Sequence, residues 1–164
     1  MNLALEEEQM KRLFANLPAR LSDCPGVLID STVFLDIISS DPVWAEWSAS
    51  ALAEAAEYAT LVINPIVYAE VSITFSKMEA LDAALPASLY QREPLPWEAG
   101  FLAGKCFLQY RRLGGARSSP RPDFYIGAHA AVRRLALLTR DAARYRTYFP
   151  AVELLSPGPR PGRR

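Results

Sequence analysis

Val27-Leu28-Ile29-Asp30 is the stretch from which the fold follows, because three apolar residues run without a break and then end at an acid. Further short, mainly apolar runs cover residues 61–63, 137–139 and 152–155, and longer segments with helical character separate them. Uninterrupted apolar strands that alternate with helices are typical of a parallel sheet covered on both faces. The sequence therefore predicts an α/β fold of three layers, with a central, mainly parallel sheet flanked by helices.

Capping and turn residues mark the helices between these strands. Asp41-Pro42 and Asn64-Pro65 each place an N-cap side chain before a proline at the first helical position. Gly114-Gly115 is a signal for a helix end. We expect helices over residues 31–38, 41–58, 65–77, 79–85, 97–113, 122–135 and 142–148, with a short edge strand within residues 89–95.

Composition favours a single domain with an ordinary core. The chain has 164 residues, of which 51% are hydrophobic and 22% charged. Its two cysteines, Cys24 and Cys106, form no C-x-x-C pair, which argues against a disulfide framework or a zinc finger. Three consecutive glutamates at residues 6–8 stand where a signal peptide needs an apolar centre, and no apolar run has bilayer length. We expect a cytoplasmic protein without a membrane partner.

The chain divides into three parts. Residues 1–24 are predicted to be an N-terminal helical extension, with an amphipathic helix over residues 3–17, and residues 25–156 to be the main domain. Residues 157–164, rich in proline, glycine and arginine, are predicted to be a disordered basic tail. The extension could be a packing helix, a segment that covers the site and dampens activity, or the product of a misassigned start.

Charge is unevenly distributed along the chain although the net charge is zero. Residues 1–104 contain 5 basic and 15 acidic residues, and residues 105–164 contain 13 basic and 3 acidic residues. A basic C-terminal half could meet phosphates. Alternatively, the fold could mix the two halves in space and average the charge.

Four acids occupy positions where the pattern predicts burial or a strand end: Asp30, Glu70, Asp123 and Asp141. Ionised carboxylates avoid such positions unless a cation or hydrogen bonds compensate them. Sites in parallel sheets lie beyond the carboxyl ends of strands, where Asp30 and Asp141 fall, and the other two acids reach this rim from helices. The four acids therefore predict a divalent-metal site and hydrolysis of a phosphodiester.

The same residues, in this order, resemble the PIN-domain ribonucleases, especially the VapC-type toxins of bacterial toxin–antitoxin pairs. The likeness extends over about residues 27–155. Four stretches carry it: Val27-Leu28-Ile29-Asp30-Ser31-Thr32-Val33-Phe34-Leu35-Asp36, Asn64-Pro65-Ile66-Val67-Tyr68-Ala69-Glu70-Val71, Pro122-Asp123-Phe124-Tyr125-Ile126-Gly127-Ala128-His129-Ala130 and Leu137-Leu138-Thr139-Arg140-Asp141.

The resemblance implies a PIN-like fold and Mg²⁺- or Mn²⁺-dependent cleavage of RNA, often by a homodimer that a cognate antitoxin inhibits. It implies that the four acids are catalytic, with Asp30, Asp123 and Asp141 as metal ligands. Thr139 matches a small polar position of the family, and Thr32 stands where the family often has asparagine. Both threonines are expected to support the site.

Other polar residues have competing interpretations. Arg117 and Arg121 could clamp RNA phosphate from a mobile loop, or could be solvated loop charges. His129 is interpreted as structural or surface rather than catalytic. Glu70 could instead pair with Arg140. Two acids have structural interpretations. Asp141 could be a helix cap, and Asp36 is interpreted as a solvated helix residue.

Two other functions compete with the nuclease. One is a non-catalytic module that binds RNA or protein on the same fold. The other is a phosphatase with Asp30 as nucleophile, which is weakened because Thr32 stands where that chemistry needs a second aspartate. Metal-dependent cleavage that Asp30→Asn abolishes would separate the nuclease from the binding module.

Overall fold

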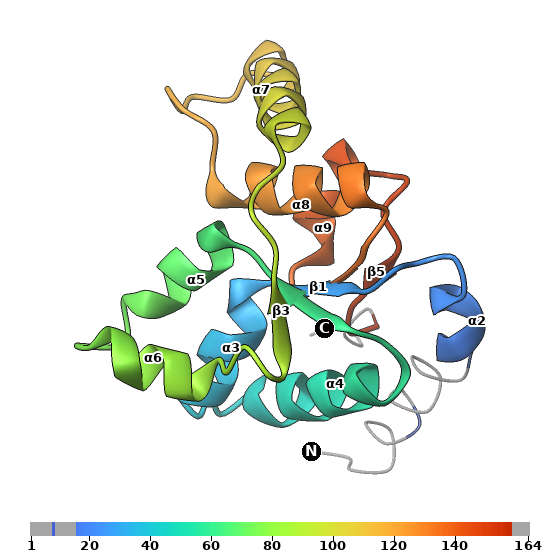
Figure 1. Ribbon diagram of the computed structural model, residues 1–164. Helices are drawn as coiled ribbons and strands as arrows, with labels where there is room; N and C mark the ends of the chain where they lie inside the picture. The colour runs from blue at the N-terminus through green and yellow to red at the C-terminus, as the bar shows by residue number, and fades with distance from the viewer. Residues whose placement is uncertain (1–7, 9–15, 159–164) are drawn as a thin grey trace, which may run out of the picture.

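Five parallel strands form the centre of the structure, a computed structural model that describes residue 8 and residues 16–158 (Figure 1). Their order across the sheet is β3-β2-β1-β4-β5, so strands from the beginning and the end of the domain meet at β1 and β4. Main-chain pairing sets Ile29 of β1 opposite Leu138 of β4. The strands are β1 (Val27–Ile29), β2 (Leu61–Ile63), β3 (Tyr90–Arg92), β4 (Ala136–Leu138) and β5 (Leu154–Leu155).

Helices connect each strand to the next. The first two connections run through α3 (Ser31–Ile38) with α4 (Ala45–Tyr58), and through α5 (Pro65–Ser72) with α6 (Met78–Ala84). The last two run through α7 (Trp97–Arg112) with α8 (Pro122–Arg133), and through α9 (Ala142–Tyr148). One more helix, α2 (Leu17–Leu21), precedes the sheet.

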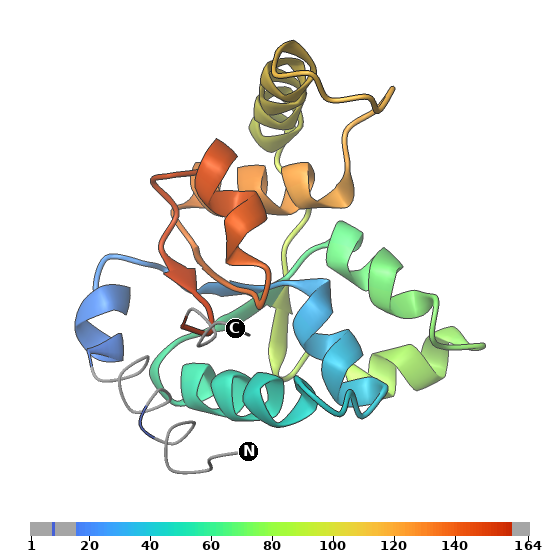
Figure 2. The same ribbon diagram turned by 180° about the vertical axis from the view of Figure 1, so that it is seen from behind.

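The helices lie in layers on the two sides of the sheet. Helices α7, α8 and α9 pack together on one side, and α3 packs against α4 on the other (Figures 1 and 2). Helix α2 is attached to the β5 edge, where Arg20 pairs with Glu153 and donates a hydrogen bond to the Leu154 carbonyl at 2.7 Å. The predicted three-layer α/β fold with a parallel sheet is therefore confirmed.

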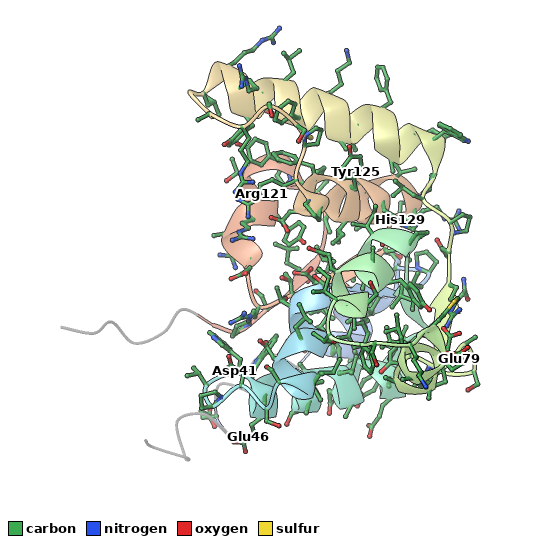
Figure 3. The ribbon with its side chains drawn as sticks, turned by 90° about the vertical axis from the view of Figure 1, so that its left-hand side faces the viewer. Asp41, Glu46, Glu79, Arg121, Tyr125 and His129 are labelled. Atoms are coloured by element: carbon green, nitrogen blue, oxygen red, sulfur yellow. The ribbon has the colours of Figure 1, made fainter. Side chains whose placement is uncertain are left out.

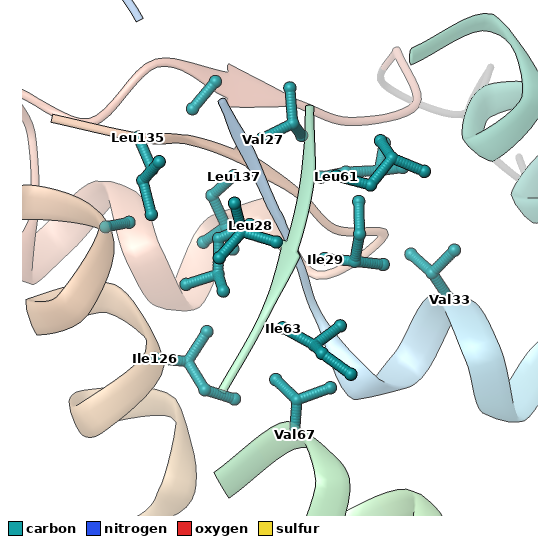
Figure 4. Close-up of a cluster of buried hydrophobic side chains, with 14 of the residues drawn as sticks. Val27, Leu28, Ile29, Val33, Leu61, Ile63, Val67, Ile126, Leu135 and Leu137 are labelled. Carbon is teal, nitrogen blue, oxygen red and sulfur yellow. The ribbon is translucent and has the colours of Figure 1, made fainter. Parts of the chain in front are cut away.

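The core is formed where the strands meet the helices on both sides. Every residue of β1, β2 and β4 is buried, which explains their continuous apolar sequences. Val33 of α3, Val67 of α5 and Ile126 of α8 pack towards these strands (Figure 4). Each such side chain stabilises the fold by about 1.5–3 kcal/mol, so the sheet can carry polar groups at its end.

Two predicted helix boundaries were wrong. The helix expected from Asp41 begins at Ala45, because Asp41 Oδ1 accepts hydrogen bonds from the N–H groups of Val43 and Trp44 and closes a turn first. The helix expected to reach residue 77 ends at Ser72. There the Thr74 hydroxyl donates to the Val71 carbonyl, which competes with continuation of the helix.

Some expectations concern segments outside the described residues. Most of the predicted helix over residues 3–17 and most of the predicted tail over residues 157–164 fall there. Within the described part, no helix combines the length and apolar character that crossing a bilayer requires.

Candidate active site

Asp30 is the buried centre of the candidate site. It follows β1 directly, and only 2% of its surface is exposed. Its N–H donates to the Leu138 carbonyl of the neighbouring strand β4 at 2.9 Å. Two hydroxyls donate to its Oδ2, Thr32 at 3.0 Å and Thr139 at 2.7 Å. Asp30 thus lies where the strand order reverses between β1 and β4, the position at which open α/β sheets bind ligands.

The surroundings of Asp30 disfavour its charge. Burial, together with smaller contributions from the negative charges of Asp123 and Glu70, raises the pKa of its carboxyl to about 6, although the Thr139 and Thr32 hydrogen bonds oppose the rise. A carboxylate in this state gains from any nearby cation. The three acids that the sequence placed on separate elements therefore act on one another in the folded protein.

Glu70 reaches the centre from α5. The Ser31 hydroxyl donates to Glu70 Oε2 at 2.7 Å and lies at 3.4 Å from Asp30 Oδ1. Since a hydroxyl has one hydrogen, the shorter contact is the hydrogen bond. Burial and the charge of Asp123 raise the pKa of Glu70, while Ser31 and Arg144 oppose this. The alternative pairing of Glu70 with Arg140 is not the one formed.

Asp123 lies in the first turn of α8, as the sequence indicated. Its Oδ2 faces two guanidinium groups, that of Arg144 from α9 at 3.1 Å and that of Arg121 at 3.6 Å. Its carboxylate is therefore held from one side by cations that belong to the rim of the site.

The three acids share one arrangement. In each carboxylate one oxygen accepts the shortest hydrogen bond, whereas within residues 16–158 the other oxygen accepts none in Glu70 and Asp123 and only the long Ser31 contact of 3.4 Å in Asp30. The oxygens with the shortest hydrogen bonds are Asp30 Oδ2, Glu70 Oε2 and Asp123 Oδ2. Oxygen donors of this kind suit Mg²⁺ or Mn²⁺. No group of three or more acid, histidine or cysteine side chains in the described chain forms a ready-made ligand set.

Asp141 is linked to the centre only through its backbone. Its N–H donates to the Thr139 hydroxyl at 3.0 Å, and the same hydroxyl donates to Asp30. Asp141 is the N-cap residue of α9, but its side chain accepts no capping hydrogen bond. Its carboxylate shares no hydrogen bond with Asp30, Glu70 or Asp123. Asp141 therefore lies beside the three acids without being joined to them.

The structure adds Tyr145 to the centre, a residue that the sequence did not single out. This side chain of α9 is 1% exposed, and its hydroxyl has no hydrogen-bond partner among the described residues. Burial raises its pKa well above the ordinary value, and the charges of Asp30, Asp123 and Glu70 contribute. The spacing of four residues from Asp141 on one helix was the available signal.

Asp36 is buried, not solvated as the sequence suggested. Only 2% of its surface is exposed. Ser48 of α4 donates to its Oδ2 at 2.8 Å, and the Arg140 guanidinium lies 3.3 Å from the same oxygen. Arg140 also lies over the ring of Trp44. Because Arg140 separates Thr139 from Asp141, this cluster fixes the loop that carries both.

His129 is structural, as expected, and it is completely buried on α8. Asn64 Oδ1 accepts from the Val67 N–H, so its amide group donates to His129 Nδ1 at 3.0 Å. The other ring nitrogen then carries the hydrogen and donates to Glu93 at 3.1 Å. Burial lowers the pKa of His129. The neutral ring thereby connects α8 with the starts of α5 and of the segment after β3.

The basic loop before α8 borders the acidic centre. Residues 116–122 line a surface cavity of about 560 Å³, and both Arg117 and Arg121 belong to it. Arg121 stands at the beginning of α8, and Tyr125 and His129 follow along that helix (Figure 3). Its contact with Asp123 places this arginine beside the acids. The loop could therefore hold a phosphate next to the carboxylates.

Comparisons with known proteins agree with this geometry. The family model described as PIN domain matches residues 27–150. Solved structures similar to the chain include VapBC2 of Rickettsia felis bound to a promoter DNA fragment, with 18% identity, a TM-score of 0.61 and coverage of 80% of this chain and 98% of that chain. VapBC-1 of nontypeable Haemophilus influenzae has 17% identity and a TM-score of 0.59, with 78% and 95% covered.

A third similar structure is a toxin–antitoxin complex of Klebsiella pneumoniae, with 20% identity, a TM-score of 0.57 and coverage of 77% of this chain and 94% of that chain. At such identities the likeness shows the fold alone. A search of curated proteins found no match.

Proposed function

The chain belongs to the PIN domain family, and we propose that it is a metal-dependent endoribonuclease, the toxin of a toxin–antitoxin pair. PIN domains are generally nucleases. One observation carries the proposal: at the switch point of the sheet, Asp30, Glu70 and Asp123 each keep one carboxylate oxygen that accepts no hydrogen bond shorter than 3.4 Å from residues 16–158. A divalent cation beside these carboxylates would offset the burial and the neighbouring negative charge that raise the pKa values of Asp30 and Glu70.

In this proposal Asp30, Asp123 and Asp141 would hold Mg²⁺ or Mn²⁺, which lowers the pKa of a bound water and offsets the phosphate charge. Thr32 and Thr139 orient the Asp30 carboxylate by donating to Oδ2. Glu70 is proposed as the fourth catalytic acid.

Glu70 is proposed to orient the attacking water and to accept its proton. Ser31 fixes the Glu70 carboxylate through Oε2, so Oε1 remains available for this task. A raised pKa makes a carboxylate a better proton acceptor. Arg117 and Arg121 are proposed to bind RNA phosphates from the neighbouring loop.

The test is cleavage of a single-stranded RNA with and without Mn²⁺ or Mg²⁺. Asp30→Asn and Asp123→Asn should each lower cleavage at least about 100-fold, because even partners of metal ligands matter by 10–100-fold. Asp23→Asn, at an exposed acid before β1, is the matched control and should cleave normally. Millimolar Mn²⁺ should also raise the melting temperature of the wild type but of neither site variant.

Retained cleavage in Asp30→Asn would refute the proposed site. RNA binding without cleavage at any metal concentration would favour the non-catalytic binding module instead. A phosphoaspartate trapped on Asp30 would favour the phosphatase.

We also propose two protein partners. The similar solved structures are toxin–antitoxin complexes, which supports a cognate antitoxin for this chain. A homodimer in the cytoplasm remains a prediction. Light scattering after gel filtration should give twice the mass of 18.2 kDa, and a monomer at micromolar concentration would contradict the dimer.

A further inference from the structure

Tyr145 presents an unused hydrogen-bond donor to the acidic centre. Its side chain is among the largest fully buried ones, yet its hydroxyl has no partner in the part of the chain that the structure describes. Buried hydroxyls without a partner are rare, because losing water without gaining a hydrogen bond costs free energy. We therefore looked for a ligand that this hydroxyl could bind.

The surroundings identify what the hydroxyl faces. The charges that act on it are those of Asp30, Asp123 and Glu70, and the Asp30 carboxylate is also a hydrogen-bonding neighbour, although no hydrogen bond of good geometry joins the two groups. These acids accept hydrogen bonds from threonine, serine and arginine through their other oxygens. The phenol thus lies next to the Asp30 carboxylate, beside which the proposed ligand would bind.

Tyrosine differs here from every other donor around the acids. Ser31, Thr32 and Thr139 each donate to a carboxylate, and Arg144 pairs with Asp123. Tyr145 alone among these has a donor that is not already used within the described chain. Its raised pKa keeps the proton on the phenol at neutral pH. It can therefore donate to an oxygen, but it cannot replace a carboxylate as a metal ligand.

We propose that Tyr145 is a positioning residue whose hydroxyl donates a hydrogen bond to an oxygen ligand bound beside Asp30, an inference that rests on the proposed nuclease function. That oxygen belongs either to a water on the divalent cation or to the RNA phosphate. Both accept a hydrogen bond from a neutral phenol. In either case the hydroxyl forms a full hydrogen bond when the centre is occupied, and it interacts only weakly with Asp30 when the centre is not.

The experiment compares Tyr145→Phe with the wild type and with Tyr148→Phe. Phenylalanine removes only the oxygen atom and preserves the packing of the ring. Tyr148 lies on the same helix α9 and packs against Phe124, with ring centroids 5.1 Å apart, so its variant controls for loss of a phenol from this helix. Three experiments are carried out. They measure the melting temperature without metal, the apparent Kd for Mn²⁺ from the rise of the melting temperature with Mn²⁺, and the kcat and KM of RNA cleavage.

Without metal, Tyr145→Phe should melt at the same temperature as the wild type or higher, since no hydrogen bond is lost. If the acceptor is a metal-bound water, the apparent Kd for Mn²⁺ without RNA should rise about 10-fold, as for other partners of metal sites. If the acceptor is the phosphate, Mn²⁺ binding should be unchanged and the cleavage parameter kcat/KM for RNA should fall about 10-fold or more. Tyr148→Phe should change neither.

Two results would overturn the inference while leaving the nuclease intact. One is wild-type Mn²⁺ binding and cleavage in Tyr145→Phe. The other is a clearly lower melting temperature of this variant without metal, which would show a structural partner for the hydroxyl. A wild-type protein that neither binds Mn²⁺ nor cleaves RNA would refute the proposed function itself, and the role of Tyr145 with it.

Discussion

Asp30 shows how a single residue can oppose the stability of the fold that holds it. The chain buries this carboxylate at the end of β1, and the hydroxyls of Thr32 and Thr139 offset only part of the cost. The pKa of Asp30 rises from 3.8 to about 6 in the folded protein. Functional sites often combine burial with neighbouring like charges in this way, because the strain is relieved when the ligand binds.

This shift predicts a pH dependence of stability. The folded state binds the Asp30 proton more tightly than the unfolded state, so the wild type should gain stability as the pH falls from about 6 towards 4. Asp30→Asn has no charge to bury and should exceed the wild type at pH 7, without metal, by about 1–3 kcal/mol. Urea denaturation at several pH values measures the difference.

The advantage of Asp30→Asn should be mostly lost by pH 4, where the folded wild-type carboxyl is protonated, and should vanish below the unfolded pKa of 3.8, where the carboxyl is protonated in both states. If Asp30→Asn exceeds the wild type in stability by the same amount at every pH, the charge of Asp30 does not destabilise the folded protein. Asp23→Asn, at an exposed position, is the control and should follow the wild type throughout.

At the scale of elements, α8 assembles the site. Its first turn carries Asp123, and further along its length His129 is bound to Asn64 before α5 and to Glu93 after β3. The same helix packs against α7, α5 and α9. A displacement of α8 would therefore move Asp123 relative to Glu70 on α5.

Gly127 on α8 offers a direct test of this packing. A Cβ atom at this position would lie 2.3 Å from two ring carbons of Phe149, so the ring or the helix would have to move. Gly127→Ala should lower the free energy of unfolding by about 1–3 kcal/mol. It should also reduce cleavage, since Asp123 belongs to the same helix. Gly127 thus permits α8 to lie close to the ring of Phe149.

Gly104→Ala on α7 is the matched control. Nothing lies within 4 Å of a Cβ atom there, so alanine should stabilise the helix by about 0.5–1 kcal/mol. Urea denaturation of both variants checks the pair. Equal effects at the two glycines would show that the contact with Phe149 is not tight.

At the scale of the whole molecule, the fold separates the two halves of the charge distribution only in part. Helices α8 and α9 of the basic C-terminal half lie on one side of the sheet together with α7, which crosses the boundary between the halves (Figure 2). The acidic N-terminal half supplies α3 and α4 on the other side. Three ion pairs nevertheless join the two halves, so the fold mixes part of the charge, as the alternative interpretation expected: Arg20 with Glu153, Arg133 with Glu93 and Arg140 with Asp36.

The two arginines of the loop before α8, Arg117 and Arg121, predict salt-dependent RNA binding through this loop. The logarithm of the RNA affinity should fall linearly with the logarithm of salt concentration, as expected when phosphates are neutralised. Arg117→Gln and Arg121→Gln should each reduce the slope by about 0.7, the value for one contact to a single strand. Fluorescence anisotropy with a labelled RNA measures the slope.

Lys77→Gln, at the start of α6, is the control for general loss of positive charge and should leave the slope unchanged. If all three variants reduce the salt slope equally, the overall charge of the protein attracts RNA, and this loop does not bind it specifically.

The sequence by itself determined the order and class of the elements. Apolar runs such as Val27–Ile29 can only be strands buried on both faces, and the proline-containing caps place helices after them. Strand ends, moreover, put Asp30 and Thr139 at one edge of the sheet without further information. These features are local, since they depend on periodicity and on the residues next to one another.

Only the tertiary structure decided which side chains meet at that edge. Whether Glu70 faces Ser31 or Arg140, and whether Asp36 is solvated or buried, depends on how helices pack across the sheet. The unpaired hydroxyl of Tyr145 likewise has no local signature. Hydrogen bonds and ion pairs between distant segments are set by packing geometry, which neighbouring residues in the sequence do not encode.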